Sequence, residues 1–283
     1  MLYIDDLKKT YPGFELEASL KVLPGRITGL VGENGSGKTT LFKAILGLIH
    51  TDGGQAALFG KPVEKLRSED RSRIGAVLAD SGFSAYITIR DAGRILKGLY
   101  PSFREDWFRE QCLRYGLPEN KKIKELSTGM KAKLKILTAL SHGADFLILD
   151  EPTAGLDVIV REDVLNMIRE YMEEDEQRSV LISSHISSDL ESLCDDFYMI
   201  HGGKIVFHEE TDRLLSDYGI LKVRPGEYDE LDKSYILKKK KESFGYSLLT
   251  DQKDYYLENA PGLVMEQAGL DELILLMIKG ESL

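Results

Sequence analysis

The chain has 283 residues, of which 42% are hydrophobic and 30% charged, which is ordinary for a globular protein with a sizeable core. Its formal net charge of -10 argues against non-specific attraction to nucleic acid. Two widely separated cysteines, Cys112 and Cys194, indicate neither a disulfide framework nor a structural zinc site.

Neither the amino terminus nor any internal segment has the pattern of a targeting or membrane-spanning sequence. The amino terminus mixes acidic and basic side chains and lacks the apolar stretch of a signal peptide. No apolar run approaches the roughly 18 residues that a spanning helix needs. We therefore expect a cytoplasmic protein that reaches a membrane only through a partner.

The amino-terminal part predicts strands and one helix around a glycine-rich loop. Partial alternation favours antiparallel strands at 2–4 and 14–18, joined by a Tyr-Pro-Gly turn. An apolar strand at 26–31 runs into the glycine-rich loop, and a helical pattern follows at 39–48. After a connecting loop with a short helix, another strand is expected at 73–78.

The middle of the chain changes from a helical region to alternating strands and helices. Apolar residues recur at helical spacing, so we expect a small helical subdomain inserted at about 84–126. The elements expected next are a helix at 127–139, a strand at 146–149, a helix at 158–174 and a strand at 179–182. Both strands are continuously apolar, as in a parallel sheet covered on both faces. Residues 1–212 are therefore expected to form one α/β domain.

Beyond residue 212 the pattern weakens, and residues 213–283 are expected to form a small α+β extension. A short strand is expected at 220–223 and a final helix at about 269–279. The lysine run at 238–241 indicates a solvated turn or a strand edge in preference to a lipid or nucleic-acid contact.

The glycine-rich loop fits the pattern G-x-x-x-x-G-K-[ST] at every fixed position. Its place between a strand and a helix directs backbone N–H groups and the positive end of the helix dipole at an anion, which an ordinary glycine-rich turn would not do. We expect Lys38 to neutralise the β- and γ-phosphates of ATP and the Thr39 hydroxyl to bind Mg²⁺. The residues expected to bind the nucleotide here are Gly32, Glu33, Asn34, Gly35, Ser36, Gly37, Lys38, Thr39 and Thr40.

Two acidic residues, Asp150 and Glu151, end the apolar strand at 146–149. A buried strand delivers Asp150 beside the phosphate loop, where we expect it to hold Mg²⁺ through water. Glu151 points in another direction and is expected to polarise the attacking water. The alternative is a pair of acids that only caps the following turn, and the phosphate loop upstream makes it the weaker interpretation.

Together these residues resemble the ABC ATPase family over about residues 1–210. The segment Leu126-Ser-Thr-Gly-Met130 is similar to the family signature LSGGQ, with Thr at its third and Met at its fifth position. Asp150-Glu-Pro-Thr-Ala-Gly-Leu-Asp157 resembles the Walker B motif followed by the D-loop, and His185 resembles the switch histidine. Tyr11 matches the aromatic residue that stacks on adenine. The resemblance implies a P-loop NTPase of the ABC type, with a mixed sheet, antiparallel amino-terminal strands and an inserted helical subdomain.

The signature segment has a physical interpretation of its own. Ser127 is a good N-cap, so the helix after it presents free N–H groups and a positive dipole end. Because the chain already has a phosphate loop, we expect Ser127, Thr128 and Gly129 to bind the γ-phosphate held by a second subunit, identical or homologous. The resemblance adds Asp157 to the nucleotide-binding set and gives Glu151 and His185 catalytic roles. The alternatives are a plain helix cap at Ser127 and a satisfied core histidine at 185.

One family position is different in this chain. Members carry a glutamine after the strand at 73–78 that contacts Mg²⁺ and the attacking water, and here that position is Ala79. We hypothesise that Asp80 supplies the metal ligand in its place. Phe83 and Tyr86 follow, in the region where the family binds its membrane subunit.

The resulting expectation is an ATP-hydrolysing subunit that drives a separate integral membrane permease, in the direction of export, from the inner face of the membrane. Its partners would be a second ATPase subunit and the permease, with no nucleic acid. Two alternatives are a soluble ABC ATPase acting on nucleic acid or the ribosome, and a regulator that binds ATP without turnover. A single cassette with a short helical insertion disfavours the first alternative, and Glu151 disfavours the second. The sequence does not name the cargo.

Overall fold

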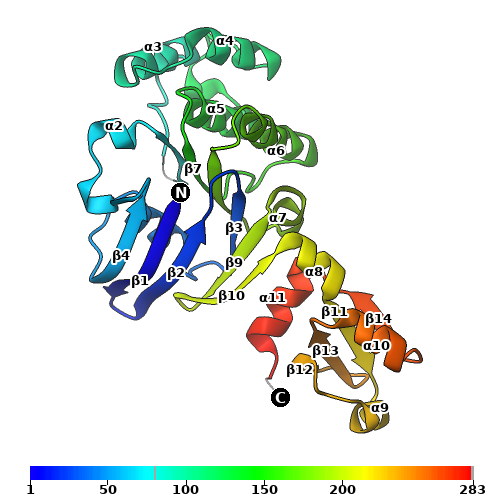
Figure 1. The fold of residues 1–283 in the computed structure, drawn as a ribbon. Helices are drawn as coiled ribbons and strands as arrows, with labels where there is room; N and C mark the ends of the chain where they lie inside the picture. Colours follow the sequence, from blue (N-terminus) through cyan, green and yellow to red (C-terminus); the bar gives the residue numbers. More distant parts are fainter. Residues whose placement is uncertain (80, 282–283) are drawn as a thin grey trace.

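The structure is a computed structural model that describes residues 1–79 and 81–281. A ten-stranded mixed sheet forms the larger body, and a four-stranded antiparallel sheet forms a smaller body near the carboxyl terminus. Figure 1 shows the larger sheet between the smaller body at one end and a helical arm at the other. The helical arm consists of α3 (Ile89–Leu99) and α4 (Glu105–Arg114).

The strands of the large sheet follow the order β5-β4-β1-β2-β10-β9-β3-β8-β7-β6. Their bounds are β1 Leu2–Tyr11, β2 Phe14–Val22, β3 Ile27–Val31, β4 Gly53–Leu58, β5 Lys61–Pro62, β6 Ile74–Val77, β7 Phe146–Asp150, β8 Ser179–Ser183, β9 Asp196–His201 and β10 Lys204–Glu210. Strands β6, β7, β8, β3 and β9 are mutually parallel. The carboxyl ends of these five strands therefore lie along one edge of the sheet.

Both faces of the parallel region are buried, which explains why its strands are continuously apolar. Along β7, Phe146 and Ile148 belong to the apolar cluster on one face. Leu147 and Leu149 belong to the cluster on the other face. Side chains alternate between the faces with a period of two, so each face receives every second residue.

Helices cover the two faces unequally. The first face packs against α1 (Lys38–Ile45). The apolar cluster on the second face includes residues of a larger set of helices: α3 Ile89–Leu99, α4 Glu105–Arg114, α5 Thr128–Leu140, α6 Val158–Glu173, α7 Ser187–Leu193 and α8 Thr211–Asp217. Two short helical segments, α2 (Ser68–Arg71) and a 3-10 turn at Val63–Lys65, follow β5.

The region 84–126, expected from the sequence as a helical insertion, contains two α-helices and a 3-10 segment. Helices α3 and α4 supply its regular structure, and residues 115–127 form turns with a 3-10 segment at Ile123–Glu125. In the large sheet, four strands were not expected from the sequence: β4, β5, β9 and β10. Strand β10 illustrates the difficulty. Its burial alternates with a period of two, but Val206 is 43% exposed and Glu209 is buried, so apolar and polar residues do not alternate along its sequence.

The small sheet has the order β12-β13-β11-β14, with β11 at Gly219–Val223, β12 at Ile236–Lys241, β13 at Tyr246–Thr250 and β14 at Val264–Gln267. Helices α9 (Pro225–Glu230), α10 (Lys253–Asn259) and α11 (Leu270–Lys279) accompany it. The lysine run forms β12 at one edge of the sheet, where charged side chains hinder pairing with another chain. Within the described residues, none of the helices combines the length and apolarity that crossing a bilayer requires.

Both cysteine side chains are buried, so their reactivity reports on the packing of the core. Cys112 and Cys194 are 1% and 6% exposed. Burial raises the pKa of the Cys112 thiol to about 12 and holds the pKa of Cys194 well above its usual range. The thiolate is the reactive form, so both thiols should react with Ellman's reagent at pH 8 at least about a hundredfold more slowly in native protein than in urea-unfolded protein. Fast reaction of either native thiol would contradict this packing.

Candidate functional site

The phosphate loop joins the end of β3 to the start of α1. Lys38 is the first residue of α1, and its side chain is buried, with 6% exposure. Its Nζ donates to the carbonyl oxygens of Gly32, at 2.6 Å, and Glu33, at 3.3 Å. The adjoining cavity of about 220 Å³ is lined by Phe14, Asn34, Gly35, Gly37, Lys38, Thr39, Thr40 and Glu151. The sequence-predicted loop therefore forms one wall of a polar pocket.

Two loop positions accept only glycine. A Cβ atom on Gly32 would lie 2.2 Å from the Ile200 carbonyl oxygen of neighbouring β9. Gly37, the N-cap of α1, has φ +113°, a backbone conformation that side chains rarely adopt. These two glycines let the backbone curl tightly enough to present its N–H groups to the pocket.

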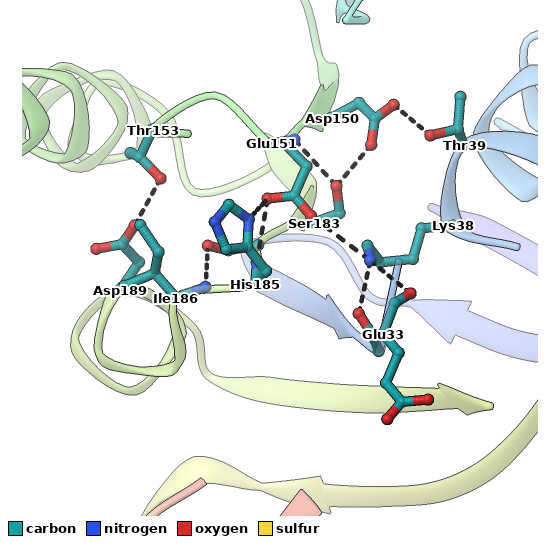
Figure 2. A network of polar contacts seen from close by, with 12 residues as sticks. Glu33, Lys38, Thr39, Asp150, Glu151, Thr153, Ser183, His185, Ile186 and Asp189 are labelled. Atoms are coloured by element: carbon teal, nitrogen blue, oxygen red, sulfur yellow. Dashed lines mark hydrogen bonds and ion pairs between the residues drawn. The ribbon is translucent and has the colours of Figure 1, made fainter. Parts of the chain in front are cut away.

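The end of β7 lies against the start of α1. Thr39 Oγ1 donates to Asp150 Oδ2 at 2.8 Å, and Ser183 Oγ of β8 donates to Asp150 Oδ1 at 2.7 Å. Asp150 is 3% exposed, so its carboxylate depends on these partners. Figure 2 shows the three side chains in a row across the ends of β7 and β8 and the start of α1.

This donor set fits Mg²⁺, which is commonly held by one or two protein oxygens together with phosphates and waters. Thr39 and Asp150 supply a hydroxyl and a carboxylate side by side. Among the described residues, no group of three or more His, Cys, Asp and Glu side chains is placed to hold a metal.

Glu151 has an unusual backbone conformation for a side chain of its size. Its φ of +51° lies in the left-handed region, where a non-glycine residue costs about 1–3 kcal/mol. Its N–H donates to Ser183 Oγ at 3.0 Å and to the Ser183 carbonyl oxygen at 3.2 Å. These bonds hold the turn that takes Glu151 out of the strand direction and into the pocket. Such strain is typical of functional residues.

Two side chains, those of Lys38 and His185, contact the Glu151 carboxylate. Lys38 Nζ lies 3.5 Å from Glu151 Oε1. His185 Nδ1 lies 2.5 Å from Glu151 Oε2, and the His185 backbone N–H donates to that oxygen at 3.1 Å. Figure 2 shows Lys38 and His185 on opposite sides of the carboxylate. The parallel strands β3, β7 and β8 thus bring together the predicted loop lysine, acid and histidine.

Other predicted residues are held away from this pocket. Ser127 Oγ accepts the Met130 N–H at 3.2 Å, which confirms the predicted N-cap of α5, and Ser127 and Thr128 are exposed. Asp157 is the N-cap of α6, where Oδ1 accepts the N–H groups of Ile159 and Val160 at 3.1 and 3.0 Å. None of these predicted residues lines the phosphate-loop cavity.

Tyr11 and Gly129 also lie outside the cavity. Tyr11 ends β1 opposite Phe14 of β2, is 40% exposed, and lies under Lys9 Nζ at 5.4 Å from the ring centroid. A Cβ on Gly129 would lie 2.9 Å from Val160 Cγ1, so α5 and α6 approach closely at their amino-terminal ends. Asp80, the hypothesised metal ligand, lies outside the described residues.

Sequence reasoning missed three contributors to the site. Phe14 lines the cavity and would touch a Cβ on Gly37, at 3.0 Å. Ser183 links Asp150 to Glu151. Thr153 Oγ1 donates to the fully buried Asp189 at 2.6 Å, which ties the turn after Glu151 to α7. The sequence contains a sign of the role of Ser183: it is a polar residue at the end of the apolar strand β8, two residues before His185.

A second cavity lies between the sheet and the helical arm. It measures about 520 Å³, and its lining is mostly apolar, with contributions from Val77, Phe83, Leu96, Leu99, Tyr100 and Leu134. Lys124, Lys131 and Lys135 also line it. Lys135 Nζ donates to the Ala79 carbonyl oxygen at 3.1 Å, so the cavity adjoins the segment that follows β6. Tyr86 lies next to it, 73% exposed.

Comparisons with known proteins agree with this geometry. The family described as ABC transporter matches residues 16–154. The ABC transporter ATP-binding protein YtrB of Bacillus subtilis (strain 168) is 33% identical over 221 residues, covering 77% of this chain and 75% of YtrB. The bacitracin transport ATP-binding protein BcrA of Bacillus licheniformis is 37% identical over 198 residues, covering 69% of this chain and 64% of BcrA.

The fold comparison shows a fold shared with a solved ATP-binding cassette. A dimeric post-hydrolysis structure of the ATP-binding cassette MJ0796, bound to ADP and Pi, matches with a TM-score of 0.65 at 19% identity, covering 75% of this chain and 99% of the cassette. The chain belongs to the ATP-binding proteins of ABC transporters. It is an ABC ATPase, the ATP-binding subunit of a transporter, with relatives that include ATP-binding proteins of exporters.

The position of Ser183 leads to a stability prediction. Ser183→Ala removes a hydrogen bond to a buried carboxylate, so we expect unfolding free energy to fall by about 1.5–3 kcal/mol. Ser179→Ala is the matched control at the other end of β8, where Oγ donates to the neutral Leu23 carbonyl oxygen at 2.9 Å. That loss should be about 0.5–1.5 kcal/mol. Urea titration of the nucleotide-free variants measures both, and equal losses would contradict the assignment.

Proposed function

We propose that this chain binds Mg²⁺ and ATP at the phosphate loop and hydrolyses ATP between two cassettes to drive a membrane permease. The observation that carries the proposal is the meeting of Lys38, Glu151 and His185 beside the Thr39–Asp150 pair, all at the carboxyl ends of neighbouring parallel strands. Phosphates bind readily where a loop opens a helix at such an edge.

Each side chain has a separate chemical task. Lys38 and the loop N–H groups neutralise the β- and γ-phosphates, and Thr39 and Asp150 hold Mg²⁺, which would neutralise further phosphate charge. Glu151 accepts a proton from the attacking water. The water oxygen bonds to the γ-phosphorus, while the bond between the γ-phosphorus and the β–γ bridging oxygen breaks and ADP leaves with that oxygen. His185 orients Glu151 and donates to the γ-phosphate. Gly32, Glu33, Asn34, Gly35, Ser36, Gly37 and Thr40 complete the phosphate loop, and Tyr11 stacks on adenine.

Two cassettes are needed because the second phosphate-binding helix end lies elsewhere on the molecule. Ser127 and Thr128 are exposed at the start of α5 and outside the cavity that contains Lys38. A second subunit, identical or homologous, supplies its own Ser127–Gly129 helix end and Asp157 turn to this chain's nucleotide. The dimeric state of the MJ0796 cassette supports such an arrangement.

The permease docks at the 520 Å³ cavity between the sheet and the helical arm. Its apolar lining suits the apolar face of a short helix, and the three lysines around it favour acidic residues on that helix. In this proposal residues 1–212 are the ATPase domain and residues 213–283 a carboxy-terminal extension, at the cytoplasmic face of the membrane. The name of the similar Nod factor export ATP-binding proteins supports export.

Two other functions fit the molecule less well. A nucleic-acid or ribosome-directed role conflicts with the net charge of -10. A regulator that binds ATP without turnover has no use for Glu151 in a left-handed backbone conformation, which costs stability.

Glu151→Gln tests catalysis and the two-cassette arrangement together. The variant should bind Mg²⁺-ATP and dimerise, while turnover falls at least about a hundredfold because the amide cannot accept the proton. Light scattering and phosphate release measure these effects. Adding Ser127→Arg in the Glu151→Gln background should retain ATP binding and abolish dimerisation. A Glu151→Gln protein that stays monomeric, alone and with every candidate partner cassette, would refute the proposal.

The docking site makes a separate prediction. Replacing Phe83 and Tyr86 together with alanine should leave ATP affinity within about twofold of wild type, because neither residue lines the phosphate-loop cavity. Copurification with the permease should be lost. Leu113→Ala is the control, since Leu113 is an 83% exposed apolar residue of α4 outside the cleft. Retained copurification of the double variant would refute this placement.

A further inference from the structure

The carboxy-terminal extension touches the ATPase body next to the catalytic histidine. Helix α7 begins at Ser187, two residues after His185. Helix α11 of the extension packs against α7 and also against strand β12 of the small sheet. Figure 1 shows α11 in the space between the large sheet and the small one. Helix α11 therefore connects the extension to the segment that carries His185.

Two hydrogen bonds join α7 and α11, and each involves the first residue of one of the two helices. Ser187 Oγ of α7 donates to Asp271 Oδ1 of α11, across 84 residues of sequence. In the opposite direction, the Leu270 N–H of α11 donates to Glu191 Oε1 of α7 at 2.5 Å. Asp271 of α11 thus binds the first residue of α7, and Glu191 of α7 binds the first residue of α11.

The first turn of α7 has no side-chain cap from its own N-cap residue. Its N-cap residue is Ile186, whose apolar side chain makes no capping hydrogen bond. Ser187 is 5% exposed, so its hydroxyl needs a protein partner, and Asp271 is that partner. The start of α7, directly after His185, is therefore fixed by a residue from the extension.

The opposite side of α7 is tied to the catalytic turn. Asp189 is fully buried and accepts hydrogen bonds from Thr153 Oγ1, at 2.6 Å, and from Arg161 Nε. Thr153 follows Glu151 by two residues. Helix α7 is consequently held from two directions, by the Glu151 turn on one side and by α11 on the other.

Apolar packing makes the attachment of α11 firm. Leu270 and Leu273 are fully buried, and they belong to the same core cluster as Leu190 and Leu193 of α7. A helix that is part of the main core cannot move independently of its neighbours without opening a cavity. The orientation of α11 is thereby transmitted to Ser187.

We infer that Asp271 is a positioning residue for ATP hydrolysis, which acts through Ser187 to hold His185 against Glu151. The inference rests on the proposed catalytic roles of Glu151 and His185. Both the Nδ1 and the backbone N–H of His185 contact Glu151 Oε2, so a displaced α7 would move both groups away from the carboxylate. Asp271 itself does not touch the pocket.

Steady-state ATPase kinetics of the full-length protein test this role. Asp271→Ala should lower kcat by roughly three- to tenfold, the scale of one lost charge-assisted hydrogen bond near the reacting groups. KM for ATP should stay within about twofold, because α7 does not line the phosphate-loop cavity. Asp271→Asn keeps an oxygen acceptor for Ser187 and should restore most of the lost kcat.

Glu272→Ala is the matched control. Glu272 is also an acidic residue in the first turn of α11, so this variant changes the helix charge in the same way without touching Ser187. It should keep wild-type kcat. Ser187→Ala should reproduce the loss seen in Asp271→Ala, and the double variant should be no slower than either single variant if the two residues act as one unit.

Hydrogen exchange separates positioning from general destabilisation. Amides of residues 185–190 should exchange faster in Asp271→Ala and unchanged in Glu272→Ala, while the amides of β3 and β7 stay protected in both. Unchanged kcat and unchanged exchange in Asp271→Ala would overturn the inference. This outcome is distinct from failure of the proposed function. In that case the Glu151→Gln variant would turn over ATP at the same rate as the wild-type protein.

Discussion

The site depends on the alignment of three parallel strands whose carboxyl ends meet at one edge of the sheet. Strand β8 lies between β3, which leads into the phosphate loop, and β7, which ends in the two acids. Ser183 at the end of β8 binds the Asp150 carboxylate through its hydroxyl and receives the Glu151 N–H on the same oxygen. A slip of one residue in either pairing would turn these side chains to opposite faces, so the strand register itself sets the chemistry.

Lys38 and Glu151 are oppositely charged partners within the pocket. Glu151 pairs with Lys38 and contacts His185, while Lys38 also donates to loop carbonyl oxygens. An arriving triphosphate brings several negative charges and competes with Glu151 for Lys38. The exchange would release the carboxylate for its role with water. Electrostatic preorganisation of this kind leaves little rearrangement for the moment of reaction.

Helix α5 connects the two surfaces through which the subunit would work. Its amino-terminal end is the exposed Ser127–Gly129 segment, and its middle turns supply Lys131, Leu134 and Lys135 to the apolar cleft. A rigid helix of this length transmits a displacement at one end to the other. The close approach of Gly129 to Val160 adds α6, whose N-cap is Asp157, to the same unit. Dimer contact and permease contact would therefore be mechanically linked.

The sequence by itself determined the phosphate loop, the Asp150–Glu151 pair, the Ser127 cap and the α/β class, because each depends on neighbouring residues with fixed spacing. It also placed four of the five parallel strands, β3, β6, β7 and β8, from their apolar runs, and it missed β9. Only the tertiary structure decided the rest. Strand β10 was not expected because its sequence does not follow its burial, with Val206 exposed and Glu209 buried.

The left-handed turn at Glu151 and the contact between Ser187 and Asp271 are made by groups far apart along the chain. No local pattern records such a pairing, since the free energy that selects it comes from burial and hydrogen bonding in the folded core.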